Sequence, residues 1–220
     1  MPAPLLTATP QDNWIVFGSG YLQKMGDAQG IPQLAADFEH RYVPRGVRIE
    51  MRRWDDDWAD LAEWIFRRAS APENVRLLCL VYSWGAGFGF RQFAHSCRDR
   101  GIPIAGAVIS DGVAHLGGRA CHRIGLSQLA AYWPPPSACF RKLPRLRLHL
   151  PDNIAKDNTW WFVQQNSWLR GHNIYWEDTG QLAAQRELIQ FRTHPYMDEC
   201  PEFQAKALEV ADRLFPSPPT

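Results

Sequence analysis

The sequence predicts an α/β fold, a three-layer sandwich in which helices flank a central, mostly parallel sheet of about five to six strands. Short apolar runs alternate with segments of helical periodicity along the chain, which is typical of parallel strands joined by crossover helices. The apolar runs are nearly continuous, as expected for strands that are buried on both faces. The 220 residues and the 45% hydrophobic content are enough for one well-buried domain. We therefore expect a single domain over residues 1–220.

Each predicted element follows from its own pattern. Apolar runs that end in turn residues predict the strands, the last of them a short additional strand: residues 13–21, 46–54, 75–82, 102–110, 158–165 and 174–178. Helical spacing of apolar residues predicts helices over residues 31–43, 55–70, 90–101 and 200–215. The second of these helices opens with the three aspartates at 55–57, and acidic residues favour a helix N-terminus.

Charge and hydropathy narrow the class of partner. The formal net charge is +1, from 24 basic and 23 acidic residues, so no global field attracts nucleic acid or an anionic membrane. No window approaches the roughly 18 consecutive apolar residues of a membrane-spanning helix, and the first residues lack the pattern of a signal peptide. We expect a soluble, cytoplasmic protein with a flexible N-terminal segment at 1–12 and a small-molecule partner.

The five cysteines are an odd set with no CxxC pair and no regular short spacing. This pattern argues against a disulfide framework and against a structural zinc site, and it favours reduced thiols. His115, Cys121 and His122 stand near one another, but their irregular spacing favours structural or exposed residues over metal ligands. We predict neither a metal nor a cofactor.

The stretch LLCLVYSWGAGFGFRQF, residues 77–93, has an apolar run that leads into Ser83 and then glycines at alternate positions. A strand that turns sharply into a helix holds its corner residue in a strained conformation and exposes that side chain at the carboxyl edge of the sheet. Ser83 is therefore expected to be a nucleophile, with the backbone N–H of Trp84 facing a developing oxyanion. In the alternative interpretation the glycines only permit close packing and Ser83 caps the helix. A dinucleotide site is disfavoured, because the glycines follow GxGxG and not GxGxxG.

A serine nucleophile needs a base, an orienting acid and a second oxyanion donor. Asp111 follows the next predicted strand, and His194 stands in a loop ahead of the last helix, so the two are expected to be the acid and the base. The turn at the end of the first strand offers a backbone N–H from Ser19 or Gly20. Alternatively, Asp111 forms a turn with Gly112, and His194 is a hydrogen-bonded loop residue.

Three further interpretations concern the surroundings of this site. Asp198, which follows His194 by four residues, is expected to cap the final helix. The proline-rich, basic segment 133–151 is expected to be a loop or lid rather than a regular element. Most of the ten tryptophans suit a core, and the side chains expected to bind an apolar or aromatic acyl group are Tyr21, Trp84, Phe88 and Trp133.

These motifs together resemble the α/β-hydrolase superfamily, especially its compact cutinase-like and fungal-lipase-like branch with uncharacterised bacterial and phage members. The resemblance covers residues 14–215 and rests on VYSWGAG as the nucleophile elbow, FGSG as the oxyanion turn, SDG after the next strand and THPYMD as the histidine loop. It implies a serine hydrolase that cleaves an ester or related acyl bond through Ser83, Asp111 and His194 without a cofactor.

Two positions depart from the pattern of that superfamily. Val81 stands where the elbow usually has its first glycine, and Asn166 and Ser167 stand where many members carry the acid. Either the acid is Asp111, an alternative position in that superfamily, or the triad is incomplete. These departures motivate an alternative function: a hydrolase-fold binding or interaction protein with weak or no catalysis.

Overall fold

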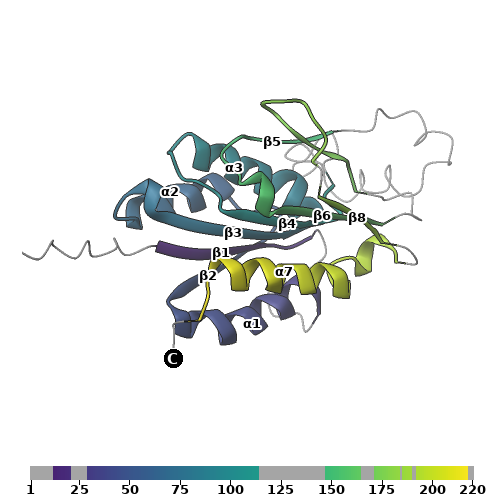
Figure 1. The fold of residues 1–220 in the computed structure, drawn as a ribbon, viewed down its shortest axis with the longest axis horizontal. Helices are drawn as coiled ribbons and strands as arrows, with labels where there is room; N and C mark the ends of the chain where they lie inside the picture. Colours follow the sequence, from purple (N-terminus) through teal and green to yellow (C-terminus); the bar gives the residue numbers. More distant parts are fainter. Residues whose placement is uncertain are drawn as a thin grey trace, which may run out of the picture.

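The computed structural model describes residues 12–20, 29–113, 147–164, 171–183, 185–189 and 192–217. Its centre is a six-stranded sheet in the order β2-β1-β3-β4-β6-β8, and all of its strand pairs are parallel. The strands of this sheet are β1 (Asp12–Gly18), β2 (Val47–Arg52), β3 (Val75–Tyr82), β4 (Gly106–Ser110), β6 (Thr159–Gln164) and β8 (Arg186–Ile189). The predicted α/β class is confirmed, and Figure 1 shows the sheet between two layers of helices.

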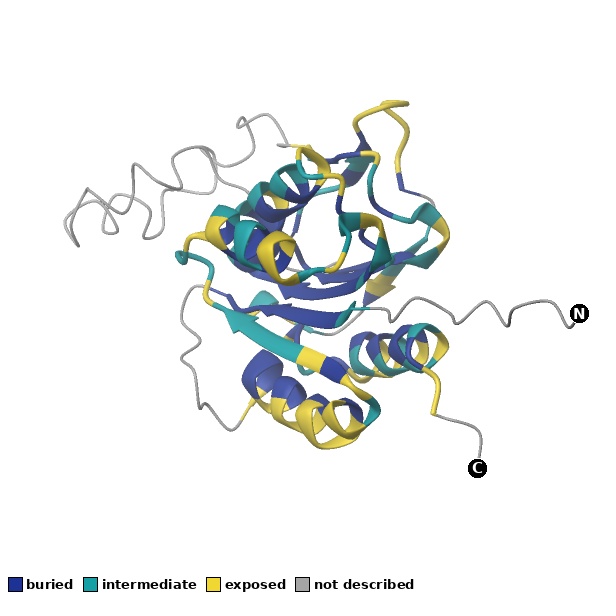
Figure 2. Ribbon diagram, turned by 90° about the vertical axis from the view of Figure 1, so that its left-hand side faces the viewer, coloured by how far each residue is buried: buried dark blue, intermediate teal, exposed yellow. Residues whose placement is uncertain are grey.

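The helices cover both faces of the sheet. The helices α1 (Gly30–Tyr42) and α7 (Pro201–Leu214) lie on one face, whereas α2 (Trp58–Arg68) and α3 (Arg91–Arg98) lie on the other (Figure 1). Figure 2 shows the buried strands at the centre and the exposed outer surfaces of these helices. The short helical segments are η1 (Val43–Arg45), η2 (Pro72–Asn74), the π-helix η3 (Gly85–Phe90), η4 (Lys156–Asn158) and η5 (His194–Tyr196).

The central strand β3 is buried on both faces, which explains its continuous apolar sequence. Leu77, Cys79 and Val81 pack in the core layer that contains α2 and α3. The alternate residues of the strand, which end at Tyr82, pack in the layer that contains α1 and α7. Tyr82, the residue before Ser83, therefore faces the same layer as the helix that follows His194.

The start of α2 agrees with its sequence pattern. The Asp57 side chain accepts hydrogen bonds from the backbone N–H groups of Ala59 and Asp60 and so caps the helix. Trp58 is fully buried in the core, and Trp64 packs edge-on against Trp14 with ring centroids 5.0 Å apart. These three tryptophans contribute to core packing.

Two strands, β5 (Leu148–Leu150) and β8, were not predicted from the sequence. The edge strand β8 carries charged residues at its start and leaves Leu188 46% exposed, so it lacks a continuous apolar run. The segment 133–151, expected to be an irregular loop, ends in the strand β5, which is a correction. Its leucines are buried and pair in parallel with β7 (Ile174–Trp176), so the predicted additional strand belongs to a second, two-stranded sheet.

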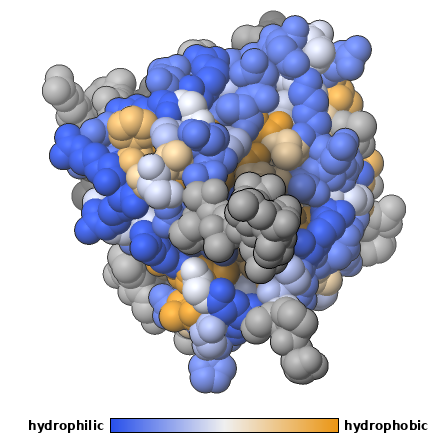
Figure 3. All heavy atoms as spheres, turned by 60° about the vertical axis from the view of Figure 1, so that its left-hand side comes forward, coloured by the Kyte–Doolittle hydropathy of each residue, from blue (hydrophilic) through white to orange (hydrophobic). Residues whose placement is uncertain are grey.

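Several sequence predictions lie outside the described residues. They concern residues 1–11 of the N-terminal segment, most of segment 133–151, and the side chains of Tyr21, Trp133, His115, Cys121 and His122. Among the described residues, no helix is both long and apolar enough to cross a bilayer. On the face drawn in Figure 3, hydrophilic side chains predominate and hydrophobic ones form small separate areas.

Candidate active site

Ser83 lies at the corner between β3 and the helical segment that follows it. The strand ends at Tyr82, and a helical run begins at Ser83 and continues through η3 into α3. Ser83 adopts a positive φ of 53°, which is uncommon for a residue with a side chain, and it is 2% exposed. A strained backbone at a strand-to-helix corner is the geometry that the sequence predicts for this position.

Two of the glycines after Ser83, Gly85 and Gly89, are required by close contacts with neighbouring elements. A Cβ on Gly85 would lie 2.5 Å from the carbonyl oxygen of Ser19, at the end of β1. A Cβ on Gly89 would overlap the indole ring of Trp58 in α2. The bare backbone lets the π-helix lie against both elements, so close packing and a strained corner occur together.

Val81 is accommodated by a glycine on the neighbouring strand. Gly18 pairs with Val81 in the parallel register of β1 and β3, and a Cβ on Gly18 would lie 2.9 Å from Val81 Cγ1. Val81 itself is fully buried. Because Gly18 has no side chain, the adjacent strand leaves room for the side chain of Val81.

His194 reaches Ser83 from the segment ahead of α7. It is the first residue of η5, and its Nε2 lies 2.7 Å from Ser83 Oγ. The side chain of His194 is 13% exposed, so a small part of it is accessible to solvent. The distance is within the range for proton transfer between a nucleophile and a base.

Asp111 lies on the other side of the imidazole. It follows β4 directly, is fully buried, and places Oδ2 2.6 Å from His194 Nδ1. Its other oxygen accepts hydrogen bonds from the backbone N–H groups of Gly171 at 2.7 Å and Gln164 at 3.4 Å. These donors compensate for the burial of a carboxylate and fix its orientation toward the imidazole.

Gly171 is a site residue that the sequence analysis missed. A Cβ at this position would lie 2.6 Å from Asp111 Oδ1, so only glycine brings its N–H this close to the carboxylate. The signal in the sequence is weak, because a single glycine beside His172 looks like an ordinary turn.

The two residues of the β1 turn differ in their backbone contacts. The N–H of Ser19 donates to the carbonyl of Arg52 at 3.0 Å and so extends the pairing of β1 with β2, which corrects the expectation that it serves as an oxyanion donor. Gly20 lies beside the corner, since a Cβ there would be 3.2 Å from Ser83 Cβ. Trp84 follows Ser83 in the helical run.

A row of partly exposed aromatic side chains adjoins Ser83. The rings of Trp84 and Phe88, both expected in the site, have centroids 5.8 Å apart. Trp54, which follows β2, meets Trp84 edge-on at 4.9 Å. Trp54 was missed because it is far from the motif in sequence and is brought there by the parallel pairing of β2 with β1.

Asp198 does not cap the final helix, which corrects the sequence interpretation. Its Oδ2 accepts a hydrogen bond from the backbone N–H of Ile31 at 3.0 Å, in the first turn of α1. Cys200 stands at the N-cap of α7 and makes no capping bond with its side chain. The carboxylate therefore joins the histidine segment to a different helix.

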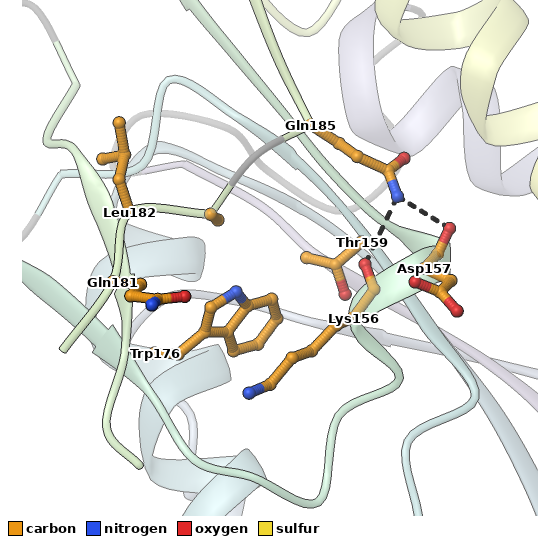
Figure 4. Close-up of a pocket in the computed structure, with 8 residues that line it drawn as sticks. Lys156, Asp157, Thr159, Trp176, Gln181, Leu182 and Gln185 are labelled. Atoms are coloured by element: carbon orange, nitrogen blue, oxygen red, sulfur yellow. Dashed lines mark hydrogen bonds between the residues drawn. The ribbon is translucent and has the colours of Figure 1, made fainter. Parts of the chain in front are cut away.

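Figure 4 shows a pocket at the other end of the sheet. Its lining includes Thr159 at the start of β6, the ring of Trp176, and Gln185, whose amide donates to the carbonyl oxygens of Lys156 and Asp157. It contains none of the predicted site residues. Within the described ranges, no group of three or more histidine, cysteine or acidic side chains is arranged to hold a metal ion.

No protein-family model matches the chain, and no curated protein matches it. Among solved structures, the chain is similar to the Vlm2 thioesterase domain with genetically encoded 2,3-diaminopropionic acid bound with a dodecadepsipeptide. The TM-score is 0.38 at 13% sequence identity, over 96% of this chain and 97% of that one. A likeness this distant says nothing about the chemistry of this chain.

Proposed function

We propose that the protein is a serine hydrolase that cleaves a carboxylic ester or a related acyl bond, with Ser83 as nucleophile, His194 as general base and acid, and Asp111 as orienting acid. The observation that carries the proposal is the continuous row of hydrogen bonds, 2.7 Å from Ser83 Oγ to His194 Nε2 and 2.6 Å from His194 Nδ1 to Asp111 Oδ2. The resemblance to the α/β-hydrolase superfamily agrees with this assignment.

In the first half of the reaction, Ser83 Oγ attacks the carbonyl carbon of the substrate while His194 Nε2 takes the hydroxyl proton. The carbonyl π electrons move to oxygen, which becomes an oxyanion. When the intermediate collapses, the bond from carbon to the leaving group breaks, and His194 returns the proton to that group. Asp111 holds the imidazole so that Nε2 is free of a proton in the resting state.

In the second half, water replaces the leaving group. His194 Nε2 takes a proton from the water as its oxygen attacks the acyl carbon, and Ser83 Oγ leaves with that proton. The products are the free acid and the original enzyme. No metal or cofactor enters either half.

We assign the oxyanion donors to the backbone of Trp84 and Gly20. Trp84 follows the nucleophile at the start of the helical run, where N–H groups point away from the helix body. Gly20 supports a second donor because its backbone lies beside Ser83. The aromatic row of Trp54, Trp84 and Phe88 favours an apolar or aromatic acyl group on the substrate.

Reaction with a fluorophosphonate probe tests the proposal, because the probe labels an activated serine and needs no knowledge of the substrate. We expect the wild-type protein to be labelled and the Ser83→Ala variant to stay unlabelled at the same concentration. A panel of p-nitrophenyl esters of increasing acyl length then measures kcat/KM. A folded wild-type protein that is neither labelled nor active would favour the alternative, a binding protein without catalysis.

A further inference from the structure

His194 stands in a short segment that is exposed around the histidine and buried at its end, where Met197 is fully buried. Its neighbours Thr193, Pro195 and Tyr196 are all exposed, Tyr196 by 56%. The helical segment η5 is short and ends at Tyr196. The apolar core therefore holds this segment from Met197 onward, since Met197 is fully buried, and hydrogen bonds must position the exposed residues around His194.

Two side chains from the sheet bond to the backbone of this segment. The hydroxyl of Tyr82 donates to the carbonyl of His194 at 2.6 Å, and the hydroxyl of Ser110 donates to the carbonyl of Met197 at 2.7 Å. Tyr82 is the last residue of β3 and Ser110 is the last residue of β4. The two residues are partners in the parallel register of these strands.

Tyr82 touches His194 a second time through its ring. The phenol ring stacks on the imidazole with centroids 5.3 Å apart and an angle of 29° between the planes. The ring also lies against Gly20, where a Cβ would be 2.6 Å from Tyr82 Cε1. Contact with the β1 turn thus restrains the ring that the imidazole rests on.

The Tyr82 hydroxyl stays protonated and can therefore act as a hydrogen-bond donor at all neutral pH values. Burial raises the pKa of Tyr82 well above its ordinary value, and the nearby carboxylates of Asp198 and Asp111 raise it further. The hydroxyl keeps its proton throughout the neutral range, so its bond to the His194 carbonyl does not depend on pH there.

We propose that Tyr82 and Ser110 are positioning residues for His194, which hold the histidine segment so that the imidazole bridges Ser83 and Asp111. This proposal rests on the proposed function. At the end of each of the two strands, two consecutive residues then have different roles. The last residue of the strand anchors the histidine segment, and the next residue, Ser83 or Asp111, contacts the imidazole. Neither positioning residue touches the substrate in this account.

The expected effect is on kcat rather than on KM. A small displacement of the imidazole spoils its geometry toward Ser83 in the transition state and leaves the aromatic row unchanged. We expect Tyr82→Phe and Ser110→Ala each to lower kcat by about tenfold with KM within about twofold, since each variant removes one hydrogen bond. Tyr82→Leu, which also removes the stacked ring, is expected to lower kcat further than Tyr82→Phe.

The matched controls remove hydroxyl groups elsewhere. Tyr42→Phe deletes the bond from a buried tyrosine to Asp212, and Thr159→Val deletes the bond from a buried threonine to the carbonyl of Ala155. Both controls are expected to lower the melting temperature as much as the test variants do and to leave kcat unchanged. Loss of kcat in the controls as well would mean that general destabilisation explains the effect, which would overturn the proposal.

Proton NMR provides a readout that needs no substrate. The proton shared by His194 Nδ1 and Asp111 is expected to resonate far downfield of the amide region in wild-type protein and to be absent in Asp111→Asn. We expect the resonance to move or broaden in Tyr82→Phe and Ser110→Ala but not in Tyr42→Phe. An unchanged resonance with unchanged kcat in both test variants would overturn the proposal. A changed resonance in a protein without any hydrolytic activity would support the positioning role while contradicting the proposed function.

Discussion

Ser83 and Asp111 share an unusual backbone conformation: among the described residues, they are the non-glycine residues with positive φ, 53° and 44°. Each directly follows a strand, β3 or β4, and these strands end in register at Tyr82 and Ser110. A residue in this conformation turns the chain abruptly and leaves its side chain at the strand end. Two adjacent strands therefore present a hydroxyl and a carboxylate to the same imidazole by the same backbone device.

The strain at Ser83 is measurable as stability. Ser83→Gly is expected to be more stable than Ser83→Ala by about 1 kcal/mol, because glycine adopts positive φ without the steric cost of a Cβ. Chemical denaturation of the two variants measures the difference, and both are expected to lack esterase activity. Equal stability of the two variants would show that the corner is not strained.

Asp111→Asn tests the acid. The amide keeps the size of the side chain but favours the wrong imidazole tautomer, so kcat is expected to fall by about a thousandfold or more. Asp212→Asn is the matched control, since Asp212 pairs with Arg41 and Arg45 at a distance from the site. A loss under about tenfold in Asp111→Asn would point to a different acid or to a serine–histidine dyad.

Gly171→Ala tests the support of the carboxylate. The added Cβ would meet Asp111 Oδ1 at 2.6 Å, so we expect the carboxylate to move and kcat to drop by about a hundredfold. Gly46→Ala is the control, because Gly46 has a positive φ of 79° and no atom within 4 Å of its Cβ position. The control is expected to lose stability and to keep full activity. Full activity in Gly171→Ala would remove Gly171 from the site.

Trp54→Leu tests the aromatic row. We expect kcat/KM to fall by about tenfold for long-chain or aromatic esters and to change little for acetyl esters, since only the larger groups reach this ring. Trp64→Leu removes a partly buried tryptophan that packs on Trp14 away from the site, and its ester preference is expected to match wild type. The same loss for acetyl esters in Trp54→Leu would contradict a role in acyl selection.

The burial of the Cys200 thiol can be tested without knowledge of the protein's function. Burial, together with its hydrogen bond to Glu202, raises the pKa of this thiol to about 11. Because the thiolate is the reactive form, alkylation by iodoacetamide at pH 8 is expected to be about a hundredfold slower than for an ordinary cysteine, and faster as pH rises. Mass spectrometry of the Cys200 peptide over time measures this rate. Alkylation as fast as that of the unfolded protein would contradict the buried position.

Much of the central sheet was predictable because its signal is local. The run at 75–82 is the strand β3 to the residue, and Asp57 caps α2 as its position among acidic residues indicates. The pairing of Ser83 with His194 rested on the order of motifs along the chain, and the short distance between the two agrees with that expectation. Local sequence thus predicted the strand and the helix cap, whereas the order of motifs predicted the pairing of Ser83 with His194.

What the sequence could not supply depends on contacts between distant segments. The edge strand β8 forms because β6 offers it a pairing partner, although its own residues are half exposed. Asp198 bonds to α1, far away in the chain, and a capping rule that considers only the following helix cannot find such a partner. The roles of Gly171 and Trp54 likewise appear only after the strands are paired.

Gly18 lies against both Val81 and Trp58, so the three residues share one packed volume between β1, β3 and α2. Gly18→Ala is expected to overpack this contact, because its Cβ would lie 2.8 Å from Trp58 Cη2 and 2.9 Å from Val81 Cγ1. Val81→Ala in the same protein relieves part of the overpacking, so the two substitutions are expected to be non-additive. A sequence pattern confined to β3 therefore cannot describe the packing around Val81, which depends on the paired residue in β1.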